Sequence, residues 1–284
     1  MQSAVEALVA RRLDPARALL RKAVDAGHVD AALMEVALTA NGSGTPADWS
    51  AAMTLLEVAA ERDKIARRHL QLLLAMDLDE AGSPRVAPRR ERLSDAPDVV
   101  RFKGFLSLEE CAHIAMTARD LLEPSYVVHP QTGHHVEHPI RTSHGAVIGP
   151  TREDLVIRAI NQRIAAISDT DVDQGEALAI LRYQPGQQFR MHHDAIAGAS
   201  NQRIKTVLLY LNAGFVGGET YFPVPKLTIE PAPGDAILFV NADANTAPDP
   251  RATHAGLPVV SGVKWLATRW IRARRVDPWS TLVD

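Results

Sequence analysis

The chain has 284 residues, of which 46% are hydrophobic and 23% are charged, a composition typical of a soluble protein with a full core. A formal charge of −3 and a pI near 6.4, without a long basic run, argue against nucleic acid or an anionic membrane as the main partner. Charges interrupt the N-terminus, so we expect neither a secretory signal nor a membrane helix. Cys111 is the only cysteine, which excludes an internal disulfide and predicts a reducing, cytoplasmic location.

Residues 1–78 are rich in Ala, Leu and charged residues, with apolar positions at helical spacing, and are predicted to be all helical. The stretch ALLRKAVDAGHVDAAL (18–33) aligns with MTLLEVAAERDKIARR (53–68), which places Leu20 on Leu55 and Ala31 on Ala66. A period of 35 residues indicates stacked helix–turn–helix units. The portion KAVDAGHVDA resembles Sel1-like repeats, which are relatives of the tetratricopeptide repeat. The alternative interpretation is a plain helical cap.

Residues 79–97 collect Pro, Gly, Ser and charges and are predicted to form a linker. We expect two helices beyond it, one opened by Ser107 and one over residues 151–168. Short apolar runs separated by turn residues then predict strands, at EALAILRY, IKTVLLYLN, ETYFP, LTIEP, DAILFVN and VKWLATRWIRA. This order predicts an α+β fold in which residues 98–284 form a double-stranded β-helix, or jelly roll, with flanking helices. Such a barrel has a mouth where a small ligand can bind.

The stretch RMHHDA, residues 190–195, contains a histidine and an aspartate at alternate positions. On an extended strand His192 and Asp194 project from the same face, whereas His193 points away. An imidazole beside a carboxylate suits a divalent transition metal, and a second histidine would leave open positions for reaction at Fe(II). His254, far downstream in THAG, is the candidate for that third ligand. A polar surface loop is the alternative for this stretch.

Several segments in the same order resemble the Fe(II)/2-oxoglutarate-dependent dioxygenases, and within them the prolyl 4-hydroxylase catalytic domain. They lie between residues 98 and 273 and read LRYQPGQ, HHD, NQRIKTVLLYLN, GGETYFP, PGDAILF, THAG and GVKWLATRW. The resemblance implies that His192, Asp194 and His254 are the catalytic iron ligands. It also implies that the co-substrate 2-oxoglutarate is bound by Tyr183, Thr220 and Lys264. A buried dicarboxylate needs a cation at its far end, which agrees with the lysine.

The resemblance also implies the reaction. O2 and 2-oxoglutarate are consumed at Fe(II), with ascorbate as a supporting reductant, and a C–H bond of the substrate is hydroxylated. We expect a peptide or protein substrate, with proline as the modified residue. One alternative is a dioxygenase of a free amino acid or another small metabolite. A second alternative is a non-catalytic binding module that keeps its metal for structure.

Residues that contact the peptide in prolyl 4-hydroxylases have counterparts in this chain, which are Arg141, Ser143, Glu176, Arg203 and Trp270. Each of them has a structural alternative, as a loop brace or as part of the core.

Two positions depart from the family pattern. Phe189 stands where the family often has a tyrosine, and Arg272 stands where a histidine can follow the tryptophan. Both are expected to alter the peptide groove. Residues 127–143 lie where the family carries a mobile lid, and their histidines are interpreted as part of a solvated loop rather than as a second metal site.

Overall fold

The computed structural model describes residues 2–128, 135–137, 140–230 and 232–279, without the side chains of residues 126–139. Contacts divide the chain into two units. The first comprises residues 1–87, 149–172 and 277–284, and the second comprises residues 88–148 and 173–276. Within the described residues, no helix combines the length and the hydropathy that a membrane crossing requires.

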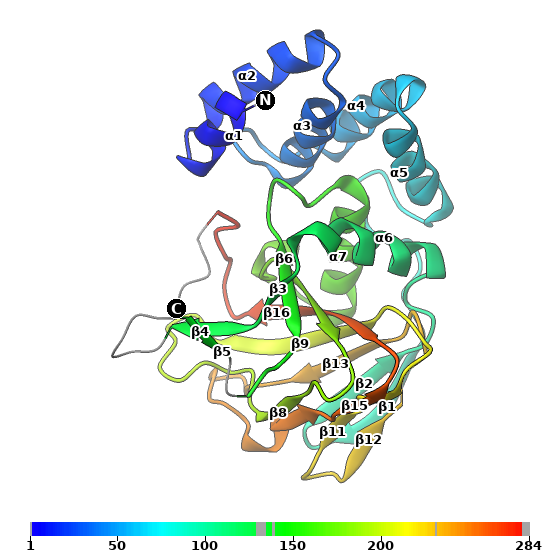
Figure 1. Cartoon of the computed structure of the whole chain (residues 1–284), viewed down its shortest axis with the longest axis vertical. Coiled ribbons are helices and arrows are strands. Elements are labelled where there is room, and N and C mark those ends of the chain that lie inside the picture. Colours follow the sequence, from blue (N-terminus) through cyan, green and yellow to red (C-terminus); the bar gives the residue numbers. More distant parts are fainter. Residues whose placement is uncertain (1, 129–134, 138–139, 231, 280–284) are drawn as a thin grey trace. The chain divides into compact units, whose positions relative to one another are not determined.

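The first unit is helical (Figure 1). Its helices are α1 (Gln2–Val9), α2 (Leu13–Asp25), α3 (Val29–Asn41), α4 (Trp49–Arg62), α5 (Lys64–Ala75) and α7 (Leu155–Ser168). Aspartate side chains cap three of them by accepting backbone N–H groups, at Asp48, Asp63 and Asp154. Helices α1 to α5 pack in chain order, each against the next, and α7 contacts α3 and α5. The sequence had placed α7 in the sheet-forming segment, but most of its residues are buried and it belongs to the helical unit.

The internal repeat coincides with helix pairs α2–α3 and α4–α5. Ala31 and Ala66 are both fully buried, as their alignment predicts. Leu20 is fully buried, but Leu55 is 37% exposed and Leu56 takes the buried position instead. The predicted pairing of Leu20 with Leu55 is therefore wrong by one residue, because the second copy is one residue shorter between its two buried positions.

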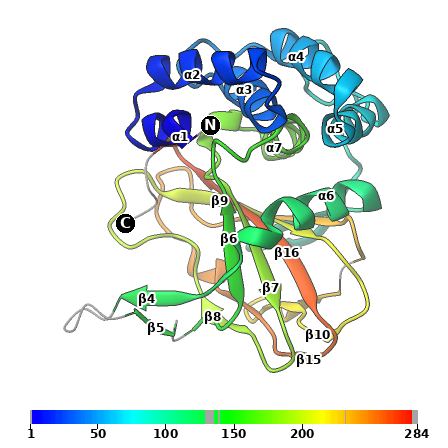
Figure 2. The same ribbon diagram turned by 45° about the horizontal axis from the view of Figure 1, so that its top comes forward.

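The second unit consists of antiparallel sheets with helix α6 (Leu108–Ala118), which packs against strand β6 (Figure 2). The predicted helix start at Ser107 is confirmed, since Ser107 and Glu110 form a reciprocal capping box. Short 3-10 helices span Arg119–Leu121, Val172–Gln174 and Pro250–Ala252.

The largest sheet has eight strands in the order β1-β2-β13-β9-β16-β7-β6-β3. They are β1 (Arg90–Asp95), β2 (Asp98–Phe102), β13 (Ala236–Val240), β9 (Arg203–Tyr210), β16 (Lys264–Arg272), β7 (Leu178–Tyr183), β6 (His144–Ile148) and β3 (Glu123–Pro124). Part of the predicted linker is thus a strand, because residues 90–95 pair antiparallel with β2. Apolar and charged side chains alternate only weakly over these residues, so little in the sequence indicated a strand there.

A second sheet has the order β12-β11-β14-β8, with β12 (Leu227–Ile229), β11 (Thr220–Phe222), β14 (His254–Gly256) and β8 (Phe189–His192). Two-stranded sheets pair β10 (Val216–Gly217) with β15 (Val259–Ser261) and β4 (Tyr126–Val128) with β5 (His135–Glu137). Apolar side chains of both larger sheets form one core cluster, which includes Leu181, Leu208, Phe222 and Phe239. The fold is therefore a mixed one, with helices and antiparallel sheets.

Candidate metal centre

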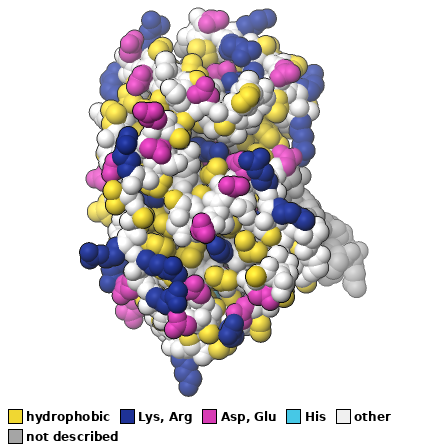
Figure 3. All heavy atoms as spheres, turned by 180° about the vertical axis from the view of Figure 1, so that it is seen from behind, with side chains coloured by type: hydrophobic (Ala, Val, Ile, Leu, Met, Phe, Trp, Pro, Cys, Tyr) yellow, Lys and Arg dark blue, Asp and Glu magenta, His cyan; other side chains and the backbone are white. Residues whose placement is uncertain are grey.

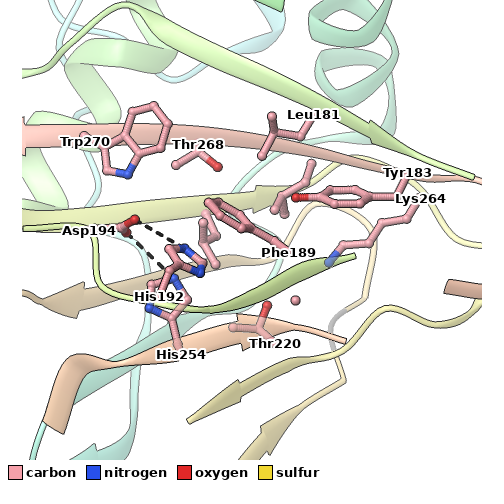
Figure 4. A pocket seen from close by; sticks show the side chains of 13 residues that line it. Leu181, Tyr183, Phe189, His192, Asp194, Thr220, His254, Lys264, Thr268 and Trp270 are labelled. Atoms are coloured by element: carbon pink, nitrogen blue, oxygen red, sulfur yellow. Dashed lines mark ion pairs between the residues drawn. The ribbon is translucent and has the colours of Figure 1, made fainter. Parts of the chain in front are cut away.

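Three potential metal ligands converge at the end of strands β8 and β14 (Figure 4). His192 ends β8 and His254 begins β14, and the two residues are register partners across the pair. Asp194 follows His192 by two residues and points back toward both rings. Its Oδ1 lies 3.6 Å from His192 Nε2, and its Oδ2 lies 3.8 Å from His254 Nε2. One cation can therefore be reached by all three side chains.

The donor set fits a metal because both imidazoles are held in one tautomer. His192 Nδ1 lies 2.8 Å from the carbonyl oxygen of Arg190, and His254 Nδ1 lies 3.0 Å from that of Ala252. A carbonyl oxygen can only accept, so each Nδ1 carries the proton and each Nε2 presents its lone pair to the shared centre. Two histidines and one carboxylate are the ligand set of non-haem Fe(II) sites.

Aromatic side chains fix the planes of the two imidazoles. The Phe189 ring stacks on His192 with centroids 3.5 Å apart and planes 10° apart. Phe222 and Phe239 pack on His254 at centroid distances of 5.3 and 4.7 Å. These rings also exclude water from one side of the centre.

Asp194 is held in its charged form by its neighbours. Burial by itself would raise the pKa of the carboxyl group, but His254, His192 and a hydrogen bond from Thr206 together lower it well below the usual range. Thr206 Oγ1 donates to Asp194 Oδ2 at 2.7 Å and accepts from Asn241 Nδ2 at 2.8 Å. This chain of hydrogen bonds orients the carboxylate toward the histidines.

His254 is held in its neutral form, which is the form that binds metal. Burial lowers the pKa of its ring to about 4, although Asp194 partly opposes that shift. Protons therefore compete poorly with a cation for its Nε2 near neutral pH.

A pocket between the two larger sheets extends from the centre (Figure 4). Its empty volume is about 390 Å³, including the space of the opening. The wall combines the three candidate ligands with apolar and hydroxyl-bearing side chains, which are Leu181, Tyr183, Phe189, Leu208, Thr220, Leu266, Thr268 and Trp270, together with Lys264.

Lys264 provides a buried positive charge in this pocket. The residue is 2% exposed, and its ammonium donates to the carbonyl oxygen of Gly218 at 2.6 Å. The Tyr183 and Tyr210 rings lie 5.5 and 5.4 Å from its Nζ. Among the described residues no carboxylate forms an ion pair with Nζ. Burial lowers the pKa of the ammonium to about 8, with Glu219 opposing.

Hydroxyl groups surround the lysine. Tyr183 is the register partner of Lys264, and burial raises the pKa of its phenol to about 12, so it remains a hydrogen-bond donor. Thr220 Oγ1 lies 2.7 Å from the hydroxyl of Tyr210, a residue that the sequence argument did not single out. This end of the pocket can therefore bind an anion through one cation and several hydroxyls.

The residues expected to contact a peptide are placed in different ways. Trp270 lines the pocket, and its indole N–H has no hydrogen-bond partner among the described residues. Arg203 lies behind it, with its guanidinium 4.1 Å from the Trp270 ring centroid. Arg141 lies at the edge of the pocket, 5.6 Å from the Phe189 ring, and donates to Ser125.

Two of the expected peptide contacts are fully buried behind the pocket wall. Glu176 is 0% exposed and accepts both Nε and Nη2 of Arg203 at 2.7 Å, and it also pairs with Arg272. Ser143 is 0% exposed and hydrogen bonds to Tyr183. In this structure neither side chain can reach a peptide. Both have the structural role that was the alternative: Glu176 braces Trp270 through Arg203, and Ser143 braces Tyr183. Arg272, one of the two departures, belongs to the same brace.

Thr206 and Asn241 were not among the site residues predicted from the sequence. Thr206 stands in a run of apolar strand residues and shares a strand face with Leu208, a pocket residue, and Tyr210. That alternation was a usable signal, whereas nothing local marks Asn241. The histidines at 129, 134 and 138 of the expected lid lie outside the described residues.

The comparisons with known proteins agree with this geometry. The 2OG-Fe(II) oxygenase superfamily matches residues 178–272, which contain all three candidate ligands and Lys264. Prolyl 4-hydroxylase 1 of Arabidopsis thaliana is 36% identical over 203 residues, which are 65% of this chain and 72% of that protein. Probable prolyl 4-hydroxylase 6 of the same plant is 36% identical over 230 residues, covering 72% and 80%.

Among solved structures, the collagen prolyl hydroxylase of Paramecium Bursaria Chlorella virus-1, in complex with 2OG, superimposes with a TM-score of 0.52. It is 29% identical and covers 64% of this chain and 99% of its own. These similarities, with the ligand set and the buried lysine in one pocket, establish that the chain is an oxidoreductase that belongs to the 2OG-Fe(II) oxygenase superfamily, whose cofactor and co-substrate are Fe(II) and 2-oxoglutarate.

Proposed function

We propose that the protein hydroxylates proline in a peptide or protein substrate. Fe(II), 2-oxoglutarate and O2 are its cofactor and co-substrates, with ascorbate as a supporting reductant. The observation that carries this proposal is the joint placement, in one pocket, of a His-Asp-His centre and a buried ammonium that forms no ion pair with any described carboxylate. A structural metal site does not require a buried ammonium beside it. The presence of Lys264 therefore argues against a non-catalytic binding module.

Each group has a defined role in this proposal. His192, Asp194 and His254 hold the metal on one side, which leaves the pocket side open. Lys264 pairs with the distal carboxylate of 2-oxoglutarate, while Tyr183 and Thr220 donate hydrogen bonds to it. Bound Fe(II) couples the oxidative decarboxylation of 2-oxoglutarate by O2 to hydroxylation of a substrate C–H bond. Phe189 and the apolar wall exclude water from this reaction.

The substrate end of the pocket supports a peptide. Trp270 offers a flat ring and an indole N–H that has no partner among the described residues. Arg203, paired with Glu176, stacks on that ring, and Arg141 lies beside Phe189. The relatives named above are prolyl 4-hydroxylases, and their similarity extends beyond the metal ligands. On the face shown in Figure 3, basic and acidic side chains are interspersed.

Two further assignments accompany the proposal. The facing sheets of eight and four antiparallel strands form the double-stranded β-helix, or jelly roll, with residues 98–284 as the catalytic segment. The helix pairs α2–α3 and α4–α5 are two Sel1-like repeats, supported by the matching burial of Ala31 and Ala66. A cytoplasmic location stays a prediction from the single cysteine.

The test is incubation of the full chain with Fe(II), 2-oxoglutarate, O2 and a mixture of proline-containing peptides. We expect succinate in a one-to-one ratio with peptides that have gained one oxygen, located on proline by fragmentation. Turnover with free amino acids but not with peptides would favour the small-metabolite alternative. Absence of 2-oxoglutarate consumption with every substrate, and also without substrate, would contradict both enzymatic assignments.

A matched pair of variants makes the test specific. His254→Ala should abolish turnover because it removes a ligand atom. His193→Ala should retain it, because His193 points away from the centre and its Nε2 lies 2.7 Å from the carbonyl oxygen of Asp249.

A further inference from the structure

The C-terminal segment Asp277–Trp279 lies against the N-terminal helices within the helical unit. It contacts residues that are more than 230 positions away in the sequence. Three chemically different groups of the segment are engaged: an acid, a backbone carbonyl and an aromatic ring. Neither the metal centre nor its pocket uses these contacts.

Trp279 makes the central contact. Its ring packs against the apolar cluster that α1, α2 and α3 build, which contains Leu8, Leu20 and Leu38. Its indole Nε1 donates to Ser43 Oγ at 2.9 Å. The cluster consists largely of alanines, whose small side chains leave room for a large ring between helices.

Arg11 binds the segment at two other points. It lies between α1 and α2 with a φ of 55°, a left-handed conformation that a non-glycine residue rarely adopts. Its Nη1 pairs with Asp277 Oδ2 at 3.3 Å, and its Nη2 donates to the carbonyl oxygen of Trp279 at 2.5 Å. The Arg11 guanidinium therefore binds both the carboxylate of Asp277 and the backbone carbonyl of Trp279.

Ser43, whose hydroxyl accepts from the indole, is itself held by neighbouring residues. Arg17 is 6% exposed and donates to Thr39 Oγ1 at 2.9 Å and to the carbonyl oxygen of Ser43 at 3.3 Å. The backbone N–H of Ser43 bonds to the carbonyl oxygen of Leu38 at 3.0 Å. Ser43 thus has little freedom, and its hydroxyl is held toward the indole.

We propose that α1, α2 and α3 form a binding site for an extended peptide of the type Asp-x-Trp, and that Asp277–Trp279 occupies it as an intramolecular ligand. A tethered segment experiences an effective concentration of the order of millimolar, so it excludes a free peptide of the same type. The docking is reversible, because it rests on an exposed ion pair and on one partly buried ring.

The test uses full-length Trp279→Ala, whose own segment has lost its anchor. A labelled peptide of residues 273–279, ARRVDPW, should bind this variant in an anisotropy titration. It should bind the unaltered protein at least about tenfold more weakly, because the native segment competes. A peptide with alanine in place of the tryptophan should lose roughly thirtyfold in affinity, as expected for a buried aromatic anchor.

Pro278→Ala is the matched control, since Pro278 is exposed between the two contact residues. This variant should behave as the unaltered protein. Equal peptide binding by the unaltered protein and Trp279→Ala would overturn the proposal. So would failure of Trp279→Ala to bind the peptide while its helical circular dichroism is intact.

Proteolysis gives a second measurement, which tests the proposal even if Trp279→Ala does not fold. Ser43→Ala removes only the indole acceptor, and trypsin cleavage after Arg275 should then be several times faster than in the unaltered protein. An unchanged cleavage rate in Ser43→Ala would contradict a role of the hydroxyl in docking. These outcomes are independent of catalysis, and so of the proposed function.

Discussion

Each of the two units buries a cation, and they do so differently. In the helical unit, Arg17 is 6% exposed and lies 3.1 Å from the carboxylate of Glu35. In the sheet unit, Lys264 is 2% exposed and has a carbonyl oxygen and two tyrosine rings around it. Among the residues that the structure describes, a carboxylate pairs with the arginine but none pairs with the lysine.

The difference separates a structural charge from a functional one. Removing a charge from water costs several kcal/mol unless an opposite charge compensates. Glu35 provides that compensation permanently, so Arg17 can brace α2 and α3. Lys264 keeps its cost until a ligand brings a carboxylate, which is why burial lowers its pKa to about 8. A bound diacid compensates the buried ammonium, and this compensation favours its binding.

The largest effect is expected for Glu35→Leu. This substitution leaves Arg17 buried without its partner, and it should lower the free energy of unfolding by about 3–5 kcal/mol in urea titrations. The double variant Arg17→Met/Glu35→Leu should recover most of that loss, because neither charge of this pair then remains buried. Equal stability of the single variant and the native protein would show that Arg17 is solvated in solution.

Lys264→Met is the corresponding change in the sheet unit. It should weaken 2-oxoglutarate binding by roughly 30- to 1,000-fold, because one carboxylate would lose its buried partner. The free energy of unfolding without ligand should stay within about 1 kcal/mol of the native value, since removal of the buried charge offsets loss of the hydrogen bond to the Gly218 carbonyl oxygen. Calorimetric titration and urea unfolding measure the two quantities. A large loss of stability with unchanged affinity would make Lys264 a structural charge like Arg17.

Thr206→Val extends the comparison to the metal. It removes the hydroxyl that donates to Asp194 at 2.7 Å while nearly preserving the side-chain shape. Metal affinity should fall by about 10- to 100-fold, as for other residues that orient metal ligands. Competition with a chelating dye measures it. Thr228→Val, at an exposed position of β12, is the matched control and should leave affinity unchanged.

The smallest effect is the pH dependence of co-substrate binding. The Lys264 ammonium has a lowered pKa of about 8. The side chain is therefore positively charged below that pH, and it loses the charge as the pH rises through 8. A diacid binds the charged form, and affinity should therefore be constant below pH 8 and fall by up to about tenfold per pH unit above it. Lys264→Met should show no such fall. Identical pH profiles for the two proteins would remove Lys264 from the site.

The sequence predicted the site better than it predicted the support around it. His192 and Asp194 are close in the sequence, and the bend that follows β8 turns Asp194 back toward His192, although an extended strand was expected through both residues. Family motifs supplied His254 and Lys264. Burial has no such local signal, so Glu176 and Ser143 were expected to face a peptide although they brace the wall from behind. Asn241 acts through Thr206 across two strands, and only the fold brings them together.

Limits of the same kind appear in the fold. The capping box at Ser107 involves neighbours in sequence and was predicted correctly. Strand β1 depends on pairing with β2, which a charged and proline-rich stretch does not reveal. The repeat register failed at Leu55 because one missing residue shifts the buried face of a helix.

The most direct test of the account is the number of divalent ions bound per chain at equilibrium. Native protein, His192→Ala and His193→Ala should be dialysed against the same limiting concentration of Fe(II) without oxygen. We predict that His192→Ala loses one bound ion relative to the native protein, and that His193→Ala, altered at the adjacent position, does not. Retention of that ion by His192→Ala would mean that the three converging side chains are not a metal centre, and the assignment of the pocket would be wrong.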